Sequence, residues 1–384
     1  MSPMPTPPIA ILGAGPSGLI LGRLLERQGI DYTIFERDTD GSVVNQGGSL
    51  DIHKGSGQLA LEQAGLIEEF KKHARLDCVT KLCDKEGNVV MSLEQQSDRP
   101  EIDRKALRQL LLDSIPGHRV QWNSKVAKVM KSDDGRMAVR LADGTVHSGF
   151  KLVVGADGAW SKARSLVTPS KPEYSGKCYL TTHIHPGNPQ YSALEELAGH
   201  GSYLALGEEK FLFAQYIGDE SFAIGFGMYF PEDWSEESRL LNDHEAMKQW
   251  ILDNNMAGWP EMHTNFIKYA EPGWRRWPLY ALPTEALSWE TVPGVALVGD
   301  AAHVTTPFQG EGVNCAMHDS VELAQQIQKY GLEDLTRAVA EYEKVMLPRG
   351  IDLITRSAES GKFLFAPDAP YGWMKNIAGK HEDS

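Results

Sequence analysis

Three short segments of the chain each combine glycines with an acidic or amide-rich turn at the end of an apolar run. The first contains Gly13, Gly15, Ser17 and Gly18, follows the apolar residues 7–12 and opens a helical pattern. In such a segment Gly13 permits a tight turn, Gly15 lets the backbone approach a pyrophosphate, and Gly18 lets helix and sheet pack closely. The N-terminus of the helix then offers free N–H groups and a positive dipole end to the phosphates.

The acidic residue that completes this first segment is Glu36, which follows the apolar residues 32–35. A carboxylate at the end of the second strand of a βαβ unit accepts hydrogen bonds from the ribose hydroxyls of a dinucleotide. Strand, glycine turn, helix, strand and acid in this order therefore predict a dinucleotide site. A glycine-rich turn without a ligand is the alternative.

The second segment, residues 155–164, begins where a buried strand pattern ends. It presents Asp157 and Gly158, and then Ser161 and Arg164 one helical turn apart. Taken alone, it could be a capped helix start, with Ser161 as the cap and Arg164 on the surface.

The third segment presents Asp300 after another apolar run, and a glycine-rich turn at residues 307–314 then opens a long helical pattern. A carboxylate at Asp300 could bind a polyol chain. The N–H groups around Gly312, Val313 and Asn314 could hold the pyrimidine end of a flavin and stabilise the negative charge that develops there on reduction.

The elements that must position these segments follow from hydrophobic periodicity and turn residues. From residue 173 to residue 287 the strands alternate or carry aromatic residues, as expected of an antiparallel sheet, and this includes 211–217 and 221–230. The remaining predictions are helices at 55–65, 103–114, 312–330 and 333–347, a hairpin of 126–130 with 138–141, buried strands at 151–154 and 295–298, and helix with loops at 350–378.

Bulk composition narrows the function classes. The chain has 384 residues, 41% of them hydrophobic and 23% charged, with a formal net charge of −14. That charge disfavours nucleic acid and anionic membranes, and no run approaches the roughly 20 apolar residues of a membrane span. The first residues do not form a signal peptide, so we expect a cytoplasmic protein. The four cysteines are scattered and are expected to be free thiols.

Together the three segments resemble the class A flavoprotein monooxygenases of the para-hydroxybenzoate hydroxylase type, and the likeness covers nearly the whole chain. Residues 47–58, 100–104, 231–234 and 307–314 are similar to the tetracycline-inactivating Tet(X)-like group. The resemblance implies an α/β fold with a Rossmann-like FAD-binding domain, an inserted antiparallel-sheet substrate domain and a C-terminal helix. The corresponding ranges are 1–172 with 288–348 for the first, 173–287 for the second and 349–384 for the C-terminal segment bridging them.

The resemblance also implies roles for individual residues. Glu36 with Arg37 would hold the adenosine ribose, Asp300 the ribityl chain, and Arg104 would contact FAD, with Arg108 as a competing choice. The implied cofactor residues are Gly13, Gly15, Ser17, Gly18, Glu36, Arg37, Asp51, Arg104, Asp157, Asp300, Gly310, Gly312, Val313 and Asn314. The substrate residues expected are Thr181, Phe213, Gly225, Pro307 and Phe308, and Phe226 and Met228 are further candidates for lining the pocket.

In this family NADPH, or NADH, binds transiently and reduces tightly bound FAD, and O2 then forms a C4a-hydroperoxide. One oxygen atom passes to an electron-rich phenolic or enolic small molecule, such as a polyketide or a tetracycline. The resemblance therefore implies no catalytic side chain and no metal, and we expect a monomer. Val44 stands where the group has an arginine linked to NADPH.

Several features leave alternatives open. A flavin-dependent halogenase shares the implied fold, although residues 274–278 do not match its Trp-x-Trp-x-Ile-Pro signature, and a flavin-containing binding protein without turnover is the rival from another class. His183 and His185 share a strand face but lack further ligands for a metal. We expect His303 to pack or form one hydrogen bond rather than act as a base, and residues 274–278 to cap a sheet edge rather than steer an anionic cofactor.

Overall fold

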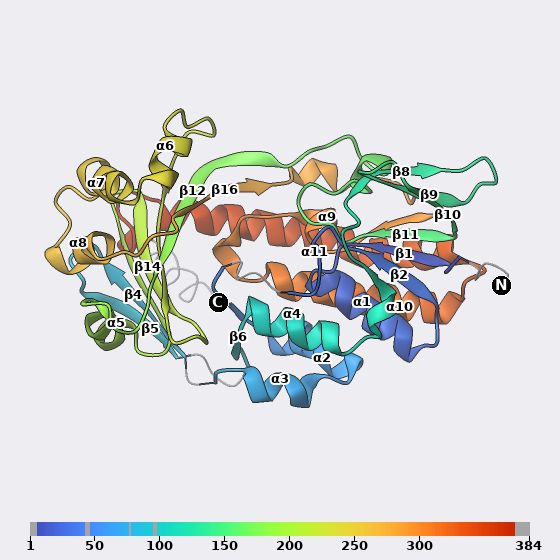
Figure 1. The fold of residues 1–384 in the computed structure, drawn as a ribbon, viewed down its shortest axis with the longest axis horizontal. Helices are drawn as coiled ribbons and strands as arrows, with labels where there is room; N and C mark the ends of the chain where they lie inside the picture. Colours follow the sequence, from blue (N-terminus) through green and yellow to red (C-terminus); the bar gives the residue numbers. More distant parts are fainter. Residues whose placement is uncertain (1–5, 43–46, 77, 95–97, 373–384) are drawn as a thin grey trace, which may run out of the picture.

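A parallel sheet built from short, largely apolar strands forms the centre of one half of the molecule, the parallel-sheet half (Figure 1). The computed structural model describes residues 6–42, 47–76, 78–94 and 98–372. Within them the strand order is β17-β11-β1-β2-β7, and every pairing is parallel. The strands are β1 (Ile9–Leu12), β2 (Tyr32–Phe35), β7 (Val120–Gln121), β11 (Leu152–Gly155) and β17 (Val295–Leu297). Because helices and a second sheet cover both faces, these strands are apolar without alternation.

Helices pack on one side of this sheet, and a three-stranded antiparallel sheet, β10-β9-β8, lies on the other (Figure 1). The helices are α1 (Pro16–Arg27), α2 (Leu59–Ala64), α3 (Ile67–His73), α4 (Arg104–Asp113), α9 (Asp300–His303) and α10 (Gly312–Tyr330). The small sheets consist of β8 (Val126–Lys131), β9 (Met137–Leu141) and β10 (Val146–Phe150), and of β3 (Ser49–Asp51) with β6 (Glu101–Asp103). The predicted helix at 312–330 and the predicted hairpin both form.

The second half is a seven-stranded sheet of order β16-β12-β15-β14-β13-β4-β5. Its strands are β4 (Val79–Asp84), β5 (Val89–Glu94), β12 (Glu173–Ile184), β13 (Ser202–Gly207), β14 (Lys210–Tyr216), β15 (Phe222–Tyr229) and β16 (Arg275–Ala281). Four helices cover one face, namely α5 (Tyr191–Ala198), α6 (Glu237–Asn242), α7 (His244–Asn255) and α8 (Glu261–Lys268). All pairings are antiparallel except that of β13 with β4.

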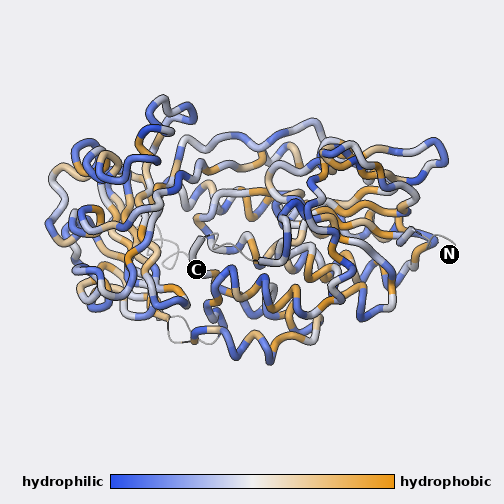
Figure 2. Tube along the Cα trace, viewed as in Figure 1, coloured by the Kyte–Doolittle hydropathy of each residue, from blue (hydrophilic) through white to orange (hydrophobic). Residues whose placement is uncertain are grey.

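Strands β4 and β5 differ from the expected division, because residues 79–94 fall in the range assigned to the nucleotide-binding part. The neighbours Leu82 and Cys83 are both buried, Leu82 in the apolar cluster on one face of the seven-stranded sheet and Cys83 in the cluster on the other. Only a strand inside this sheet gives adjacent residues a core on each side. Figure 2 shows apolar residues running along the strands of both halves.

A single 30-residue helix, α11 (Leu335–Leu364), runs from the parallel-sheet half to the seven-stranded sheet (Figure 1). The sequence predicts that one helix ends at residue 347, just before Pro348, and that a new segment begins at residue 349. The helix is instead continuous through both positions. Proline in a helix interior costs a hydrogen bond. Buried residues on both sides of it, Met346 and Gly350 among them, keep the helix packed. Among the described residues no helix has the length and apolar character needed to cross a membrane.

Candidate cofactor and substrate site

A cavity of about 530 Å³ opens at the carboxyl ends of β1, β2 and β11. Such a cavity at the carboxyl edge of a parallel sheet is the usual ligand site of this architecture. Two of the three sequence segments meet in it, together with α4. Its lining includes Leu12–Pro16, Phe35–Asp38, Arg104, Lys105, Arg108, Ser124–Val126, Ala156–Trp160 and Lys162.

The glycine turn has the geometry expected for a phosphate cradle. Gly13 has φ +101°, and a Cβ at Gly18 would lie 2.1 Å from the Gly13 carbonyl oxygen, so both positions need glycine. A Cβ at Gly15 would meet no protein atom within 4 Å, because this backbone faces the cavity. No side chain caps the N-terminus of α1, and its first N–H groups are left for a ligand. Ser17 lies buried in the first helical turn.

Glu36 holds this turn and borders the same cavity. Its Oε2 accepts a hydrogen bond from the Ala14 N–H at 2.6 Å, and its Oε1 accepts one from the Asp38 N–H at 3.0 Å. A carboxylate oxygen has two lone pairs, so each can still accept a ribose hydroxyl. Arg37 is exposed beside it on the lining. The predicted ribose contact therefore has a suitable position.

Both candidate arginines of α4 line the cavity, but their surroundings differ. Arg108 donates to the Ala14 carbonyl at 3.1 Å and pairs with Asp38 at 2.7 Å, so it stabilises the protein wall. Arg104 is solvent-accessible and pairs with no acid among the described residues. Burial lowers the pKa of Arg104, and the charge of Asp300 opposes this. As a residue of the cavity lining, Arg104 is an accessible cation in a concave site. Arg104 is thus the one available to a ligand.

Asp157 has a free hydrogen-bond acceptor that suits a ligand with hydroxyl groups. Its Oδ2 accepts the Lys162 N–H at 2.7 Å, whereas its Oδ1 is buried and has no partner among the described residues. A buried acceptor without a donor is costly and is usually satisfied by water or a ligand. Burial raises the pKa of Asp157, with Ser161 opposing. These groups fit a dinucleotide with hydroxyl donors and a pyrophosphate.

Arg164 shows how the second and third segments are joined, which the sequence alternative missed. The residue is buried, not on the surface. Its guanidinium donates to the carbonyl oxygens of Ala301 at 2.8 Å, Ala159 at 2.6 Å and Asp300 at 2.6 Å. Ser161 does accept N–H hydrogen bonds as a cap, at 3.2 Å from Ala163 and from Arg164. In the sequence, only the short distance along the chain between Asp157 and Arg164 pointed to this role of Arg164.

A second group of predicted residues gathers beside the main cavity rather than in its lining. A Cβ at Gly310 would lie 3.3 Å from Asp51 Oδ1, and the Asn314 amide donates to the Asp51 carbonyl at 2.9 Å. Asn314 also accepts the His53 N–H at 2.8 Å. Gly312 starts α10, which has no side-chain cap, so the N–H groups of its first turn, Val313 included, are left for a ligand.

The charge of Asp300 interacts with that of Arg104, which lines the main cavity. Asp300 follows Gly299 at the start of α9, and no described residue donates a hydrogen bond to its carboxylate. Burial raises the pKa of Asp300, and His303 and Arg104 oppose this. Asp300 is nevertheless solvent-accessible. An accessible carboxylate surrounded by protein is suited to bind a ligand hydroxyl.

Three of the predicted substrate residues lie side by side on adjacent strands. Thr181 of β12 pairs with Gly225 of β15, which pairs with Phe213 of β14. A Cβ at Gly225 would lie 2.2 Å from the Phe213 ring, so the glycine makes room for that ring. Thr181 accepts a hydrogen bond from Trp277 Nε1 at 2.8 Å.

The other two predicted substrate residues, Pro307 and Phe308, lie in a short 3-10 helix (Pro307–Gln309). The Phe308 ring approaches Tyr179 of β12 at 6.4 Å and Phe365 at 5.6 Å between ring centroids. Tyr179 in turn approaches Phe213 at 5.9 Å. The predicted residues therefore border one aromatic surface, which we call the aromatic face and which comprises Tyr179, Phe211, Phe213, Phe308 and Phe365.

Phe226 and Met228 were wrong as pocket residues. Both are buried in the core between the sheet and its covering helices. Successive side chains of a strand alternate between faces, so Gly225 and Gly227 point to the aromatic face while Phe226 and Met228 point away. Val44, the other position singled out for the reductant, lies outside the described residues.

The remaining candidates from the sequence have structural partners. His185 Nδ1 lies 2.5 Å from Glu271 Oε2, and Arg276 of the edge strand β16 donates to Glu237 at 3.0 Å and to the Pro231 carbonyl at 2.8 Å. Arg276 thus fastens a sheet edge to the loop that follows β15. The four cysteines are buried, and none of them forms a disulfide among the described residues.

Comparison with known proteins agrees with this geometry. Residues 6–209 and 283–346 match the model of the family described as "FAD binding domain". The chain is 32% identical over 397 residues to "Monooxygenase penA" of Penicillium thymicola, covering 89% of this chain and 91% of that protein.

Solved structures share the fold. HpxO of Klebsiella pneumoniae, complexed with FAD and uric acid, has a TM-score of 0.78 at 21% identity and covers 98% of this chain and 92% of its own. The tetracycline destructase Tet(55) has a TM-score of 0.75 at 18% identity and covers 98% of this chain and 96% of its own.

Proposed function

The chain belongs to the class A FAD-dependent monooxygenases, and from this premise we propose that it uses NADPH and O2 to hydroxylate an electron-rich phenolic or enolic small molecule. The observation that carries the proposal is that one cavity of about 530 Å³ is lined by the glycine turn that can bind phosphates, by Asp157, whose Oδ1 has no hydrogen-bond partner among the described residues, and by the accessible Arg104. FAD held in this cavity would supply the redox chemistry, namely electron uptake from the reductant and activation of O2.

The residues of the cavity would hold FAD along its length. Glu36 and Arg37 would bind the adenosine ribose, and the N–H groups after Gly15 would bind the pyrophosphate. Arg104 lines the same cavity, and its charge interacts with that of Asp300. Asp157 and Asp300 would each accept hydroxyl groups of the ligand, Asp300 from the ribityl chain. The supporting observation is that both carboxylates keep an acceptor that no described residue uses.

The group around Asp51 would receive the flavin ring. The uncapped N-terminus of α10 places free N–H groups of Gly312, Val313 and Asn314 where the positive end of the helix dipole lies. Such donors stabilise negative charge that develops on a ring edge during reduction. Gly310, with φ +69°, keeps the approach open beside Asp51.

The aromatic face would bind the substrate and exclude water. Rings from β12, β14, the segment at Phe308 and the end of α11 pack on one another at 5–7 Å between centroids, and together they offer an aromatic surface to a substrate ring. Burial raises the pKa of Tyr179, so its hydroxyl keeps its proton and can donate to a substrate oxygen. The Thr181 hydroxyl, which already accepts from Trp277, can also donate. These features favour an aromatic or enolic substrate with oxygen substituents.

The reductant would dock transiently at the cavity mouth, where four exposed cations line the rim. These are Arg37, Lys105, Lys125 and Lys162. In a chain of net charge −14, a local excess of positive charge steers a polyanion to this opening. We include NADPH rather than NADH in the proposal, with NADH as the alternative outcome.

We also propose a domain organisation and an oligomeric state. The parallel-sheet half would be the FAD-binding domain, the seven-stranded sheet the substrate-binding domain, and α11 the bridge between them. We propose a monomeric, cytoplasmic enzyme. Light scattering during size-exclusion chromatography would test the monomer.

The test mixes the purified protein with NADPH in air, alone and with each member of a panel of phenols, enols, polyketides and tetracyclines. Substrate-stimulated NADPH oxidation, with one atom from ¹⁸O2 found in the product by mass spectrometry, is the expected result. Turnover that requires chloride and yields a halogenated product would indicate a halogenase. A yellow protein that oxidises no reductant with any compound would contradict the proposal.

A further inference from the structure

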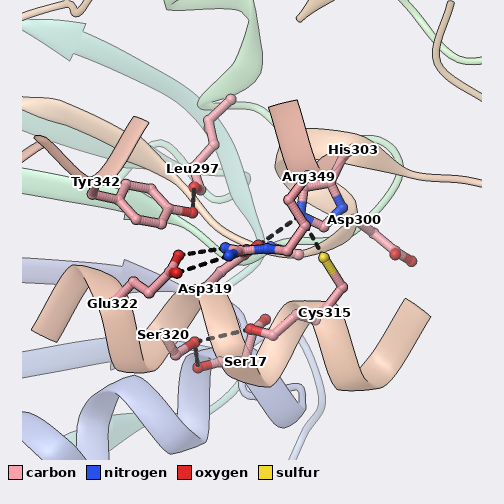
Figure 3. Close-up of polar contacts among 12 residues, drawn as sticks. Ser17, Leu297, Asp300, His303, Cys315, Asp319, Ser320, Glu322, Tyr342 and Arg349 are labelled. Carbon is pink, nitrogen blue, oxygen red and sulfur yellow. Dashed lines mark hydrogen bonds and ion pairs between the residues drawn. The ribbon is translucent and has the colours of Figure 1, made fainter. Parts of the chain in front are cut away.

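A network of buried charges lies directly beneath the turn that presents Asp300 (Figure 3). Asp319 of α10 and His303 of α9 are fully or almost fully buried, and Arg349 of α11 joins them together with Glu322. Two carboxylates thus face two cations, and the charges balance. Burying a charge costs free energy even when the charge is paired, so we expect this network to have a function.

Asp319 is the centre of the network because it contacts three elements. Its Oδ2 accepts the Gly299 N–H at 2.8 Å and lies 2.6 Å from His303 Nε2, and its Oδ1 accepts from Arg349 at 2.9 Å. Gly299 directly precedes Asp300. The side chain of Asp319 therefore ties α11, α9 and the turn before Asp300 to one point of α10.

The turn itself cannot be held by its own side chain. Gly299 has φ +60° and ψ −141°, and a Cβ there would lie 2.8 Å from the Ala316 Cβ. A residue without a side chain and with a positive φ has many alternatives in a free chain. The hydrogen bond from its N–H to Asp319 selects one of them.

We propose that Asp319 is a positioning residue of the cofactor site, which holds the Gly299–Asp300 turn so that the Asp300 carboxylate faces the cofactor. Figure 3 shows this carboxylate pointing away from the buried charges. The neighbouring Ser320 donates to the Ser17 carbonyl at 2.8 Å, so adjacent residues of α10 fasten both the first and the third sequence segments. The inference rests on the proposed function.

The same side chains could be taken for a metal site, since the ligand atoms of His303, Cys315 and Asp319 lie within 4.8 Å of one another. The contacts favour an ion pair instead. Both oxygens of Asp319 already accept N–H groups, and the Arg349 cation adjoins them. Burial opposes a charged imidazole, but Asp319 and Cys315 outweigh it and raise the pKa of His303 well above 6.5.

The neutral variant Asp319→Asn tests the role, and Glu343→Gln is its matched control. Glu343 of α11 is also a buried acid, accepting from Trp289 Nε1 at 2.8 Å and Thr291 Oγ1 at 2.5 Å, but it does not touch the turn. Both variants should lower the melting temperature of the apoprotein. Only Asp319→Asn should weaken FAD binding, about tenfold to a hundredfold in a fluorescence titration, as expected for loss of a hydrogen bond to a charged group.

A spectroscopic readout separates positioning from stability. The ¹⁵N resonances of His303 should show a charged imidazolium at pH 8 in the wild type and a neutral ring in Asp319→Asn. Should the variant not fold, hydrogen exchange on the wild-type apoprotein decides, because the Gly299 amide should be protected. Rapid exchange of that amide, or equal FAD affinity in Asp319→Asn and wild type, would overturn the inference. A wild type that binds no FAD would instead overturn the proposed function.

Discussion

The two halves of the molecule differ in the atoms that form their proposed binding surfaces, which are mainly backbone in one half and side chains in the other. In the parallel-sheet half, the cavity wall is largely backbone: glycine turns, uncapped helix N-termini and carboxylates that hold N–H groups. In the seven-stranded half, the proposed binding surface consists of aromatic side chains that meet across strands and helix ends. One surface is fixed by turn geometry and the other by packing.

This difference explains what each half tolerates. A backbone cradle recognises what every FAD molecule shares, and a single added methyl group can close it. A face of packed rings can exchange one ring for another of similar volume at modest cost. We therefore expect substitutions in the first half to remove the cofactor, and substitutions in the second to change which substrate reacts.

The largest expected effect comes from Gly18→Ala. The added Cβ would lie 2.1 Å from the Gly13 carbonyl oxygen, a backbone atom that cannot move without opening the turn. We expect a loss of about 3 kcal/mol in the free energy of unfolding and no retained FAD. Chemical denaturation and the absorbance of the purified protein measure both. Gly15→Ala, which meets no protein atom, should keep its stability and lose affinity only; equal stability of all three proteins would contradict the contrast.

Asp300→Ala should come next, because it removes a carboxylate but leaves the turn intact. FAD affinity should fall by about tenfold to a hundredfold, the value of a hydrogen bond to a charged group. Equilibrium dialysis of the cofactor measures this. Asp253→Ala, which removes an exposed acid on α7, is the control and should bind FAD normally. A fully yellow Asp300→Ala protein after dialysis would refute the role of this residue.

Gly225→Ala tests the aromatic face. Its methyl group would lie 2.2 Å from the Phe213 ring and displace it. We expect the KM for the substrate to rise about tenfold while FAD affinity stays unchanged. Ile224→Val, on the opposite face of the same strand, should cost about 1 kcal/mol of stability and leave KM as it is. Parallel changes in KM for both variants would show that the two faces are not distinct.

The smallest effect concerns two buried histidines with opposite pH behaviour. Burial lowers the pKa of His263, which accepts from Tyr203 and donates to the Lys85 carbonyl, so the unfolded state binds the extra proton and stability falls as pH drops below about 6.5. The raised pKa of His303 gives stability that is complete below about 6.5 and is lost as pH rises above it.

Denaturation of the wild type, His263→Gln and His303→Gln between pH 5 and pH 8 measures these contributions. Each proton contributes about 1.4 kcal/mol per pH unit within its window. Removing His263 should flatten the acid side of the stability profile, and removing His303 should flatten the alkaline side. The same change in slope in both variants would mean that the two rings share one charge state.

Turn chemistry explains why the cofactor side could be predicted from the sequence. Gly13, Glu36, Asp157 and Asp300 each follow an apolar strand, and a parallel sheet brings such strand ends together. Arg164 was missed because a buried guanidinium bonded to three carbonyl groups and an exposed one beside a cap have the same local pattern.

The sheet half was less predictable because both faces of β15 are buried. Alternation identifies two faces but not which one meets the ligand, so Phe226 was placed with Phe213. We predicted no element for residues 79–94 from the sequence, and no local pattern reveals that β4 pairs with β13, over a hundred residues away. The helical pattern around Pro348 suggested a break, and burial on either side of it decided otherwise.

The continuity of α11 has a mechanical consequence. Arg349 lies near its middle, joined to Asp319, and Gly361 lies twelve residues on, where the Phe308 ring packs closely against the helix. At about 1.5 Å per residue this stretch is a rod of about 18 Å. We therefore expect a displacement of Phe308 to pass along this rigid stretch to Arg349 and, through Asp319, to the Gly299–Asp300 turn, because Pro348 lies just outside the stretch.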